Sequence, residues 1–329
     1  MDAQDSSVVK SFHGVHNPGV ELKMQWVDDI RVNFSAIQRR VNTLTKRRSL
    51  KKAWQAAWLL KAVSCIDLTT LSGQDTPGKV KRLCAKAKNP ISLELQKALE
   101  VEDLNITTGA VCVYHEMVPV AVKALEGTDI PVAAVSTGFP AGLSSFATRL
   151  EEIKHSVAAG AKEIDIVITR GLVLNGKWQQ LYDEIKAFKK ACGSDVHMKT
   201  IISTGELSTL NNVARASMVA MMAGSDFIKT STGMESTNAN LAVSLVMTRM
   251  IRHYQVLTGY RVGFKPAGGI STAKDAINYL VLMKEELGDY WLNPEMFRFG
   301  ASSLLADIER QLEHHVTGRY SAFHRHPIS

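Results

Sequence analysis

Short apolar runs alternate with amphipathic segments along most of the chain, from about Ala53 onward. We expect each apolar run to be a strand. Residues 1–52 are polar instead, with Gly14, Pro18 and Gly19 near their start, and we expect a helical stretch after these residues. The predicted strands are residues 62–68, 109–114, 132–137, 163–169, 197–203, 225–231, 261–267 and 297–302.

Helical periodicity marks the segments between the predicted strands. In residues 178–191, large apolar side chains recur at the three- and four-residue spacing that places them on one helix face. We expect the other segments with helical character to be helices as well. These segments are residues 150–157, 211–222 and 242–254.

The alternation of strands and helices predicts the fold class. Strands that alternate with helices pair in parallel through βαβ crossovers. Eight such units form either a closed (β/α)8 barrel or an open doubly wound sheet. An open sheet would be favoured by a GxGxxG turn after the first strand, and residues 67–73 (DLTTLSG) lack it. The pattern therefore predicts a (β/α)8 TIM barrel, whose active site lies at the C-terminal ends of its strands.

Length and composition fit one barrel with an extension. The chain has 329 residues, of which 45% are hydrophobic and 22% are charged, as in ordinary globular proteins. We divide it into an N-terminal extension (1–52), an α/β barrel (53–318) and a C-terminal tail (319–329).

Most of the net positive charge lies in the extension. Residues 1–52 hold ten Lys and Arg against five Asp and Glu, so they contribute +5 of the net charge of +7. Basic runs such as KRRSLKK (46–52) can contact nucleic acid, but neither interleaved aromatic residues nor a nucleic-acid-binding motif is present. We interpret the run as the solvated face of an N-terminal helix and expect no nucleic-acid partner.

Cysteine usage and hydropathy predict the compartment. Cys65, Cys84, Cys112 and Cys192 lie far apart without a CxxC pair, which predicts neither a metal site nor a redox pair. The N-terminus lacks an apolar signal core, and no run reaches the ~18 apolar residues of a membrane span. We expect a cytoplasmic protein with reduced thiols and no membrane partner.

Several predicted strands carry an ionisable residue among apolar neighbours, where desolvation is costly. Strand side chains alternate between two faces, so Lys229 shares a face with Phe227, and Lys265 shares one with Gly263. If these faces point into the barrel, three amines and at least one carboxylate converge at one mouth. The residues concerned are Asp67, Asp165, Lys199, Lys229 and Lys265.

This group of charges predicts Schiff-base chemistry. A salt bridge, such as one between Asp165 and Lys199, would account for a single member but not for all of them, because unpaired buried charge is costly. Desolvation and a nearby cation both lower a lysine pKa, and a neutral amine is the nucleophile that forms a Schiff base with a carbonyl. Lys229 and Lys265 would be the nucleophile and its cationic neighbour. Asp165 would move protons, through a water.

Two loops at the end of the barrel are suited to an anion. PAGGIST (266–272) follows the seventh predicted strand, and GASSLL (300–305) follows the eighth. Glycines let backbone N–H groups approach an anion, a helix N-terminus favours negative charge, and Ser302 and Ser303 add hydroxyl donors. These loops are the usual phosphate site of such barrels. The predicted ligand is a small phosphorylated carbonyl compound.

Six segments carry a resemblance to a known family. In matching order from about Trp54 to Tyr320, the chain resembles the deoxyribose-phosphate aldolases, and its extension and residues 54–63 (WQAAWLLKAV) resemble the longer, animal-type members. The six segments are IDLTTL (66–71), EIDIVI (163–168), GEL (205–207), SDFIKTSTG (225–233), VGFKPAGGI (262–270) and RFGASSLL (298–305).

The resemblance implies a class I aldolase on a (β/α)8 barrel. Such an enzyme cleaves 2-deoxy-D-ribose 5-phosphate reversibly to D-glyceraldehyde 3-phosphate and acetaldehyde, without metal or organic cofactor. It implies that Lys229 forms the Schiff base, that Lys265 tunes the Lys229 pKa, and that Asp165 transfers protons. Lys199 would assist this network.

The resemblance also implies which residues meet the substrate. Asp67 and Thr69 would line the pocket, and Cys112 would lie near it. The phosphate would be held by Gly233, Gly268, Gly269, Ser302 and Ser303.

Two positions depart from the family's pattern. Met234 stands where the family usually has a lysine that helps to hold phosphate, so phosphate affinity is weaker here or another cation substitutes. His115 stands where the family usually has proline, either as a harmless change or as a group that titrates at the mouth. In some members the C-terminal segment reaches over the active site, and the sequence does not decide whether residues 319–329 do so.

Two other functions stay open on the sequence. One is a Schiff-base aldolase acting on a different phosphorylated aldehyde or ketose. The other is a non-catalytic scaffold that binds through its basic N-terminal extension, although intact Lys229, Lys265 and Asp165 argue against it. The expected ligand is a small phosphorylated sugar, and the sequence allows a homodimer.

Overall fold

The structure is a computed structural model that describes residues 16–322 and 325–326. Within this part of the chain, eight parallel strands stand in the order β7-β6-β5-β4-β3-β2-β1-β8. The parts of the predicted extension and tail at residues 1–15, 323–324 and 327–329 lie outside the described residues. The strands are β1 (Ile66–Thr69), β2 (Ala110–Tyr114), β3 (Val132–Ser136), β4 (Glu163–Val167), β5 (His197–Ile201), β6 (Phe227–Lys229), β7 (Gly263–Lys265) and β8 (Phe299–Ala301).

The sheet closes between its first and last members. Parallel bridges join Phe264 to Phe297 and Ala267 to Gly300, next to β7 and β8. The Gly300 N–H donates to the Pro266 carbonyl at 2.9 Å. This closure confirms the predicted (β/α)8 barrel.

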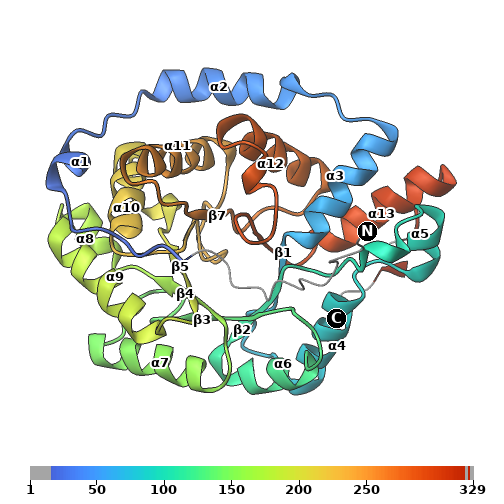
Figure 1. The fold of residues 1–329 in the computed structure, drawn as a ribbon, viewed down its shortest axis with the longest axis horizontal. Helices are drawn as coiled ribbons and strands as arrows, with labels where there is room; N and C mark the ends of the chain where they lie inside the picture. The colour runs from blue at the N-terminus through green and yellow to red at the C-terminus, as the bar shows by residue number, and fades with distance from the viewer. Residues whose placement is uncertain (1–15, 323–324, 327–329) are drawn as a thin grey trace, which may run out of the picture.

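At least one helix follows each strand, and the helices surround the barrel (Figure 1). Several begin with a side chain that accepts a backbone N–H of the first turn, as Thr209 does from Asn212 at 3.1 Å. The α-helices that follow strands are α4 (Pro77–Lys88), α5 (Leu93–Ala98), α6 (Val118–Ala124), α7 (Phe146–Ala158), α8 (Arg170–Leu174), α9 (Trp178–Cys192), α10 (Leu210–Met222), α11 (Leu241–Thr258), α12 (Ala273–Glu286) and α13 (Leu304–Thr317). The 3-10 turns are η1 (Glu102–Leu104), η2 (His115–Met117), η3 (Thr204–Glu206) and η4 (Asp289–Trp291).

From residue 16 onward, three helices precede the first strand and pack on the outside of the barrel. They are α1 (Met24–Asp28), α2 (Phe34–Arg47) and α3 (Lys52–Ser64). Figure 1 shows α2 running along the outer side of α11 and α12, with which it is in contact. The described part of the predicted extension therefore lies against the barrel.

The basic run at residues 46–52 is exposed as predicted, but it does not lie on one helix face, and this part of the prediction is wrong. Helix α2 ends at Arg47, and α3 begins at Lys52. Arg47 and Arg48 both reach Glu285 of α12, at 3.2 and 2.8 Å. Both arginine side chains stay exposed, so part of the run's charge is paired with the barrel at a solvated surface.

The first predicted strand begins too early. Residues 62–64 are the last turn of α3, and β1 begins only at Ile66. Ala62 and Val63 are fully buried, because α3 packs against α12 and α13. A short apolar run does not distinguish a buried helix from a buried strand, which explains the error.

Alternation along the strands separates an apolar layer from a polar interior. In β4, the side chains of Ile164 and Ile166 join the core between the sheet and the helices. The side chains of Glu163 and Asp165 lie on the opposite face of the strand and point into the barrel. The functional side chains therefore come from the inner faces of short strands whose outer faces are held by the core.

Candidate active site

Seven charged side chains lie buried inside the barrel and form what we call the interior charge cluster. Each is at most 3% exposed. They come from five strands and from the residue before β8, so closure of the barrel is what assembles them. The members are Asp67, Glu163, Asp165, Lys199, Lys229, Lys265 and Arg298.

Asp165 is the hub of the cluster. Its Oδ2 accepts from Lys229 Nζ at 2.7 Å and from Lys265 Nζ at 2.8 Å. Its Oδ1 accepts from Lys199 Nζ at 3.3 Å. The sequence predicted the convergence of these three amines with this carboxylate, and the barrel brings all four together.

The two lysines that donate to Asp165 Oδ2 have pKa values shifted in opposite directions. Burial lowers the pKa of Lys229, and the charge of Lys265 adds to this, while Asp165 opposes it. Burial also opposes the charge on Lys265, but Asp165 and Asp67 outweigh burial and hold the pKa of Lys265 above its usual range. Lys229 is therefore the amine suited to be a nucleophile, and Lys265 stays a cation.

Asp165 stays ionised in this setting. Burial disfavours its carboxylate, but Lys199, Lys229 and Lys265 outweigh burial and hold the pKa of Asp165 well below its usual range. An ionised carboxylate next to the nucleophile can accept a proton, directly or through water.

Sequence reasoning missed two members of the cluster, Glu163 and Arg298. Glu163 contacts Lys199 Nζ, and Arg298 Nη2 donates to Glu163 Oε1 at 2.8 Å. Glu163 lies two residues before Asp165 in the same strand, so alternation could have found it. Arg298 directly precedes β8, and its neighbours Phe297 and Phe299 both join the core, so alternation within the predicted strand could have found it too.

A cavity of about 330 Å³ opens above Lys229 at the C-terminal ends of the strands. It is lined by loops that follow β1, β6, β7 and β8. Of the predicted substrate residues, six line it: Thr69, Gly233, Gly268, Gly269, Ser302 and Ser303. The other lining residues are Leu71, Lys229, Thr232, Met234, Ala267, Ile270, Ser271, Gly300 and Ala301.

One end of this cavity has the properties of an anion site. Ser303 precedes α13 and forms no side-chain cap, so no side chain caps the first N–H groups of this helix at that position. On the facing loop, Gly268 has φ +81°, and a Cβ there would lie 2.6 Å from Asn238 Cγ. Only glycine fits this backbone.

Lys229 is the only charged residue among those lining the cavity in the described chain. Met234, at the position where the resembling family usually has lysine, lines it with an apolar side chain that is 54% exposed. Apart from Lys229, the cavity lining offers an anion only backbone N–H groups and hydroxyls.

Two of the predicted substrate residues do not line the cavity. Asp67 is buried, with Lys265 on one oxygen and Arg298 on the other at 2.6 Å. Cys112 is buried beside Ala133 and Val135, and burial raises the pKa of its thiol. Contact of either residue with a substrate stays a prediction.

His115 and the described part of the tail lie at other places. His115 Nδ1 is 3.6 Å from Glu152 Oε1 of α7. In the tail, Tyr320 stacks on His314, and His326 lies 2.8 Å from Glu313. The described tail residues thus follow α13, and none of them lines the cavity.

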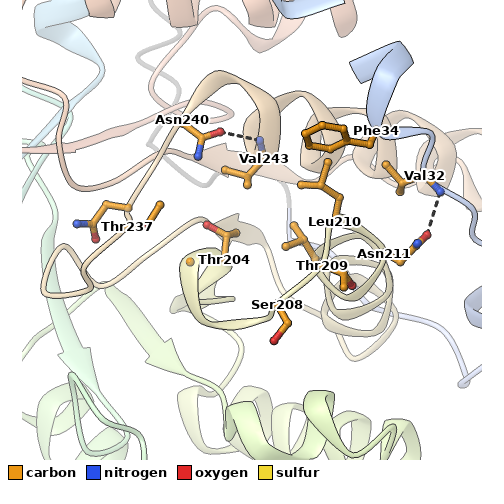
Figure 2. Close-up of a pocket in the computed structure, with 13 residues that line it drawn as sticks. Val32, Phe34, Thr204, Ser208, Thr209, Leu210, Asn211, Thr237, Asn240 and Val243 are labelled. Carbon is orange, nitrogen blue, oxygen red and sulfur yellow. Dashed lines mark hydrogen bonds between the residues drawn. The ribbon is translucent and has the colours of Figure 1, made fainter. Parts of the chain in front are cut away.

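A second cavity, of about 460 Å³, lies outside the barrel (Figure 2). It is bounded by the starts of α10 and α11 and by Val32 and Phe34 of the N-terminal segment. The Val32 N–H donates to Asn211 Oδ1 at 2.9 Å. Among the described residues, those that line this cavity are apolar or carry hydroxyl and amide groups, and none is charged.

The described residues also lack two other kinds of feature. Across residues 16–322 and 325–326, no group of three or more His, Cys, Asp or Glu is placed to hold a metal ion. None of the helices in these ranges is both long and apolar enough to cross a bilayer.

Comparisons with known proteins place the chain among aldolases. The model of the DeoC/LacD family aldolase matches residues 61–310. Human and bovine deoxyribose-phosphate aldolases are each 60% identical over 316 residues, covering 95% of this chain and 99% of the relative. A crystal structure of a putative deoxyribose-phosphate aldolase from Toxoplasma gondii has a TM-score of 0.68 at 20% identity, covering 82% of this chain and 98% of that one. At that identity the structure supports the fold.

Proposed function

The chain belongs to the DeoC/LacD aldolase family, and from this membership we propose that it is a lyase that cleaves 2-deoxy-D-ribose 5-phosphate reversibly to D-glyceraldehyde 3-phosphate and acetaldehyde. The observation that carries the proposal is that Lys229 is buried, lines the cavity and has a lowered pKa. Human deoxyribose-phosphate aldolase, at 60% identity, supports the substrate.

The reaction begins with the amine of Lys229. Its neutral Nζ attacks C1, the aldehyde carbon of the open-chain sugar, and forms a carbinolamine. Loss of water gives the protonated Schiff base, which is an electron sink for the next step. Lys265 stays protonated next to Lys229, which favours the neutral form of the attacking amine.

Cleavage then breaks the bond between C2 and C3. The C3 hydroxyl loses its proton, the C3 carbonyl forms, and the electron pair of the broken bond passes through C2 into the iminium nitrogen. D-Glyceraldehyde 3-phosphate leaves, and the remaining enamine takes a proton at C2. Hydrolysis of the resulting iminium releases acetaldehyde and frees Lys229.

Asp165 is the proposed proton carrier in these steps. Its carboxylate lies 2.7 Å from Lys229 Nζ, so a water on it would reach the C3 hydroxyl of a sugar bound to that nitrogen. Lys199 and Lys265 hold its two oxygens in place. They keep the carboxylate ionised between proton transfers.

The proposed phosphate site is the far end of the cavity. The loops at Gly268 and Gly269 and at Ser302 and Ser303 offer N–H groups and hydroxyls, and the start of α13 adds its dipole. The family membership and this anion end favour a phosphorylated substrate over the non-catalytic scaffold considered from the sequence.

We also propose a cytoplasmic location, which the four unpaired, buried cysteine thiols support. Reversible cleavage of deoxyribose phosphate would serve catabolism of deoxyribonucleosides there.

Borohydride trapping tests the function. The protein is incubated with 2-deoxyribose 5-phosphate, reduced with borohydride, digested and examined by peptide mass spectrometry. We expect one reduced adduct, on Lys229, and no adduct in Lys229→Ala. Lys274→Ala, on the exposed face of α12, should trap like the wild type. An adduct on Lys265 or Lys199 would overturn the role of Lys229, and no adduct in folded protein would overturn the aldolase mechanism.

A further inference from the structure

The interior charge cluster is not balanced. Three carboxylates, those of Asp67, Glu163 and Asp165, face four basic side chains, those of Lys199, Lys229, Lys265 and Arg298. If all seven are ionised, one positive charge is left without compensation in the buried interior. Uncompensated buried charge is costly, and a lysine avoids it by losing its proton.

The partners of each cation show where the excess falls. Lys265 contacts both Asp67 and Asp165, and Lys199 contacts Glu163 and Asp165. Arg298 contacts Asp67 and Glu163. Among the described residues, Lys229 has a single carboxylate partner, Asp165, and it shares the accepting oxygen with Lys265. It is the least compensated of the four.

Arg298 is the member of the cluster that does not titrate. A guanidinium keeps its charge in proteins, so the excess has to be removed elsewhere. Burial opposes this charge, but Glu163 and Asp67 outweigh it and hold the pKa of Arg298 above its usual range.

We propose that Arg298 is a positioning residue for the Schiff-base reaction. Its fixed charge, held on Asp67 and Glu163, gives the barrel interior one more cation than the carboxylates compensate. Lys229 removes this excess by losing its proton. Arg298 does not line the active-site cavity and acts only through these two carboxylates. The inference rests on the proposed function, since it explains how the nucleophile of that reaction becomes neutral.

The local structure holds Arg298 in one geometry. Its Nη1 donates to Asp67 Oδ1 at 2.6 Å, its Nη2 donates to Glu163 Oε1 at 2.8 Å, and its Nε donates to the Pro294 carbonyl. Gly109 makes room for it, since a Cβ there would lie 3.1 Å from Arg298 Cδ and 2.9 Å from the Ser64 carbonyl oxygen. The planar guanidinium donates from separate nitrogens to two carboxylates. A lysine would have to contact both with a single ammonium group.

Other titratable groups face these side chains from neighbouring elements. Cys112 of β2 faces Lys229, and burial raises the pKa of this thiol, so it stays neutral. Cys65, before β1, faces Arg298, and burial raises the pKa of its thiol to about 11. A cavity of about 280 Å³ at the N-terminal end of the barrel also reaches Arg298 and Glu163. The remaining ionisable residues that line it are His16, Asp129, Lys162, Asp195, His197 and Glu295.

The pH dependence of kcat/KM in three variants tests the proposal. The acid limb of kcat/KM reports the proton that Lys229 must lose in the free enzyme. Arg298→Met removes the surplus cation, so we expect this limb to move at least one pH unit to higher pH, with the alkaline plateau within a few fold of the wild type. Below the limb, a one-unit shift means about tenfold lower kcat/KM.

A double variant provides the matched control. Glu163→Gln with Arg298→Met removes one anion and one cation, which restores an excess of one cation. We expect its acid limb to return toward the wild-type position, although it carries two changes in the interior. A purely structural role for Arg298 predicts instead that the second change adds to the first or leaves the limb where it is, and that result would overturn the proposal.

Further readouts keep the test decisive. Arg298→Lys preserves the charge and should shift the limb less than Arg298→Met. If Arg298→Met does not fold, Glu163→Gln alone decides. It raises the cation excess, so its limb must lie at lower pH than in the wild type, and a limb at the same or a higher pH would refute the idea. If borohydride traps an adduct on Lys229 of the wild type but the acid limb is unchanged in all variants, this inference is wrong and the proposed function stands.

Discussion

Lys229 and Lys265 donate to the same oxygen of Asp165, with Nζ to Oδ2 distances of 2.7 and 2.8 Å. Two protonated amines on one carboxylate oxygen repel each other, and the carboxylate compensates only one of them. Lys265 has a second carboxylate, Asp67, on its other side. The lysine without that second partner is the one whose pKa falls, because burial and Lys265 together lower the pKa of Lys229.

This relationship predicts the effect of Lys265→Leu. Without the neighbouring cation, the pKa of Lys229 rises, so the acid limb of kcat/KM moves to higher pH. Because Lys265 also holds Asp165, the plateau should fall as well, by about 10²-fold or more. Rate measurements from pH 5 to 10 would show both effects, with Lys265→Arg as the variant that keeps the charge. A lower plateau with an unmoved limb would contradict the tuning role.

Met234→Lys should tighten binding of the phosphorylated substrate. The cavity is lined by one charged residue in the described chain, Lys229, and Met234 is half-exposed at its wall. A lysine here would place a second cation near the anion end, and an exposed charge pair contributes about 0.2–1 kcal/mol, or up to about fivefold in KM. The KM for 2-deoxyribose without phosphate should not change. Met234→Gln, similar in length but uncharged, is the control, and an equal gain in that variant would assign the effect to shape.

The inward-pointing side chains of the site can be predicted from the alternation of side chains along each strand. The sequence predicted that Asp165, Lys199, Lys229 and Lys265 meet if the charged faces of their strands point into the barrel, and in the structure the three amines do contact this carboxylate. Alternation along β4 puts Glu163 on the same face as Asp165, so the same rule would have added a third carboxylate to Asp67 and Asp165. The pairing of Lys265 with Asp165 spans 100 positions along the chain, so it follows only from closure of the barrel.

Other features depend on packing that no local pattern shows. Residues 62–64 look like the start of a strand but are helical, because α3 is covered by α12 and α13. The two carboxylate partners of Arg298, Asp67 and Glu163, lie 231 and 135 positions away along the chain, so these pairings follow only from closure of the barrel. The pairing of Arg47 and Arg48 with Glu285 likewise depends on how α2 lies across α12.

The acidic members of the cluster predict a loss of stability at low pH. Burial opposes the carboxylate of Asp165, but the surrounding lysines outweigh it and hold its pKa well below the usual range. Its contribution to the free energy of unfolding is therefore present above the unfolded pKa of about 4 and is lost as pH falls through the folded pKa.

Asp165→Asn should cost about 3–5 kcal/mol of unfolding free energy at pH 6, because it leaves buried cations without a partner. The difference from the wild type should shrink by pH 3, as urea unfolding at several pH values would show. Glu126→Gln, at an exposed position, is the control, and a difference that does not vary with pH would contradict the role of this charge.

Asn17 should be a major anchor of the N-terminal segment. Its side chain is 1% exposed and donates to the Met221 and Ser225 carbonyls at 2.7 and 3.0 Å. Its Oδ1 accepts from the Tyr254 hydroxyl at 3.1 Å. Asn17→Ala leaves these buried groups unpaired, so we expect a loss of about 3 kcal/mol in urea unfolding, with kcat unchanged because Asn17 does not line the active-site cavity. Asn33→Ala removes the exposed cap of α2 and should cost about 1 kcal/mol. Equal losses in the two variants would mean that the buried amide does not anchor the segment more strongly than a surface cap.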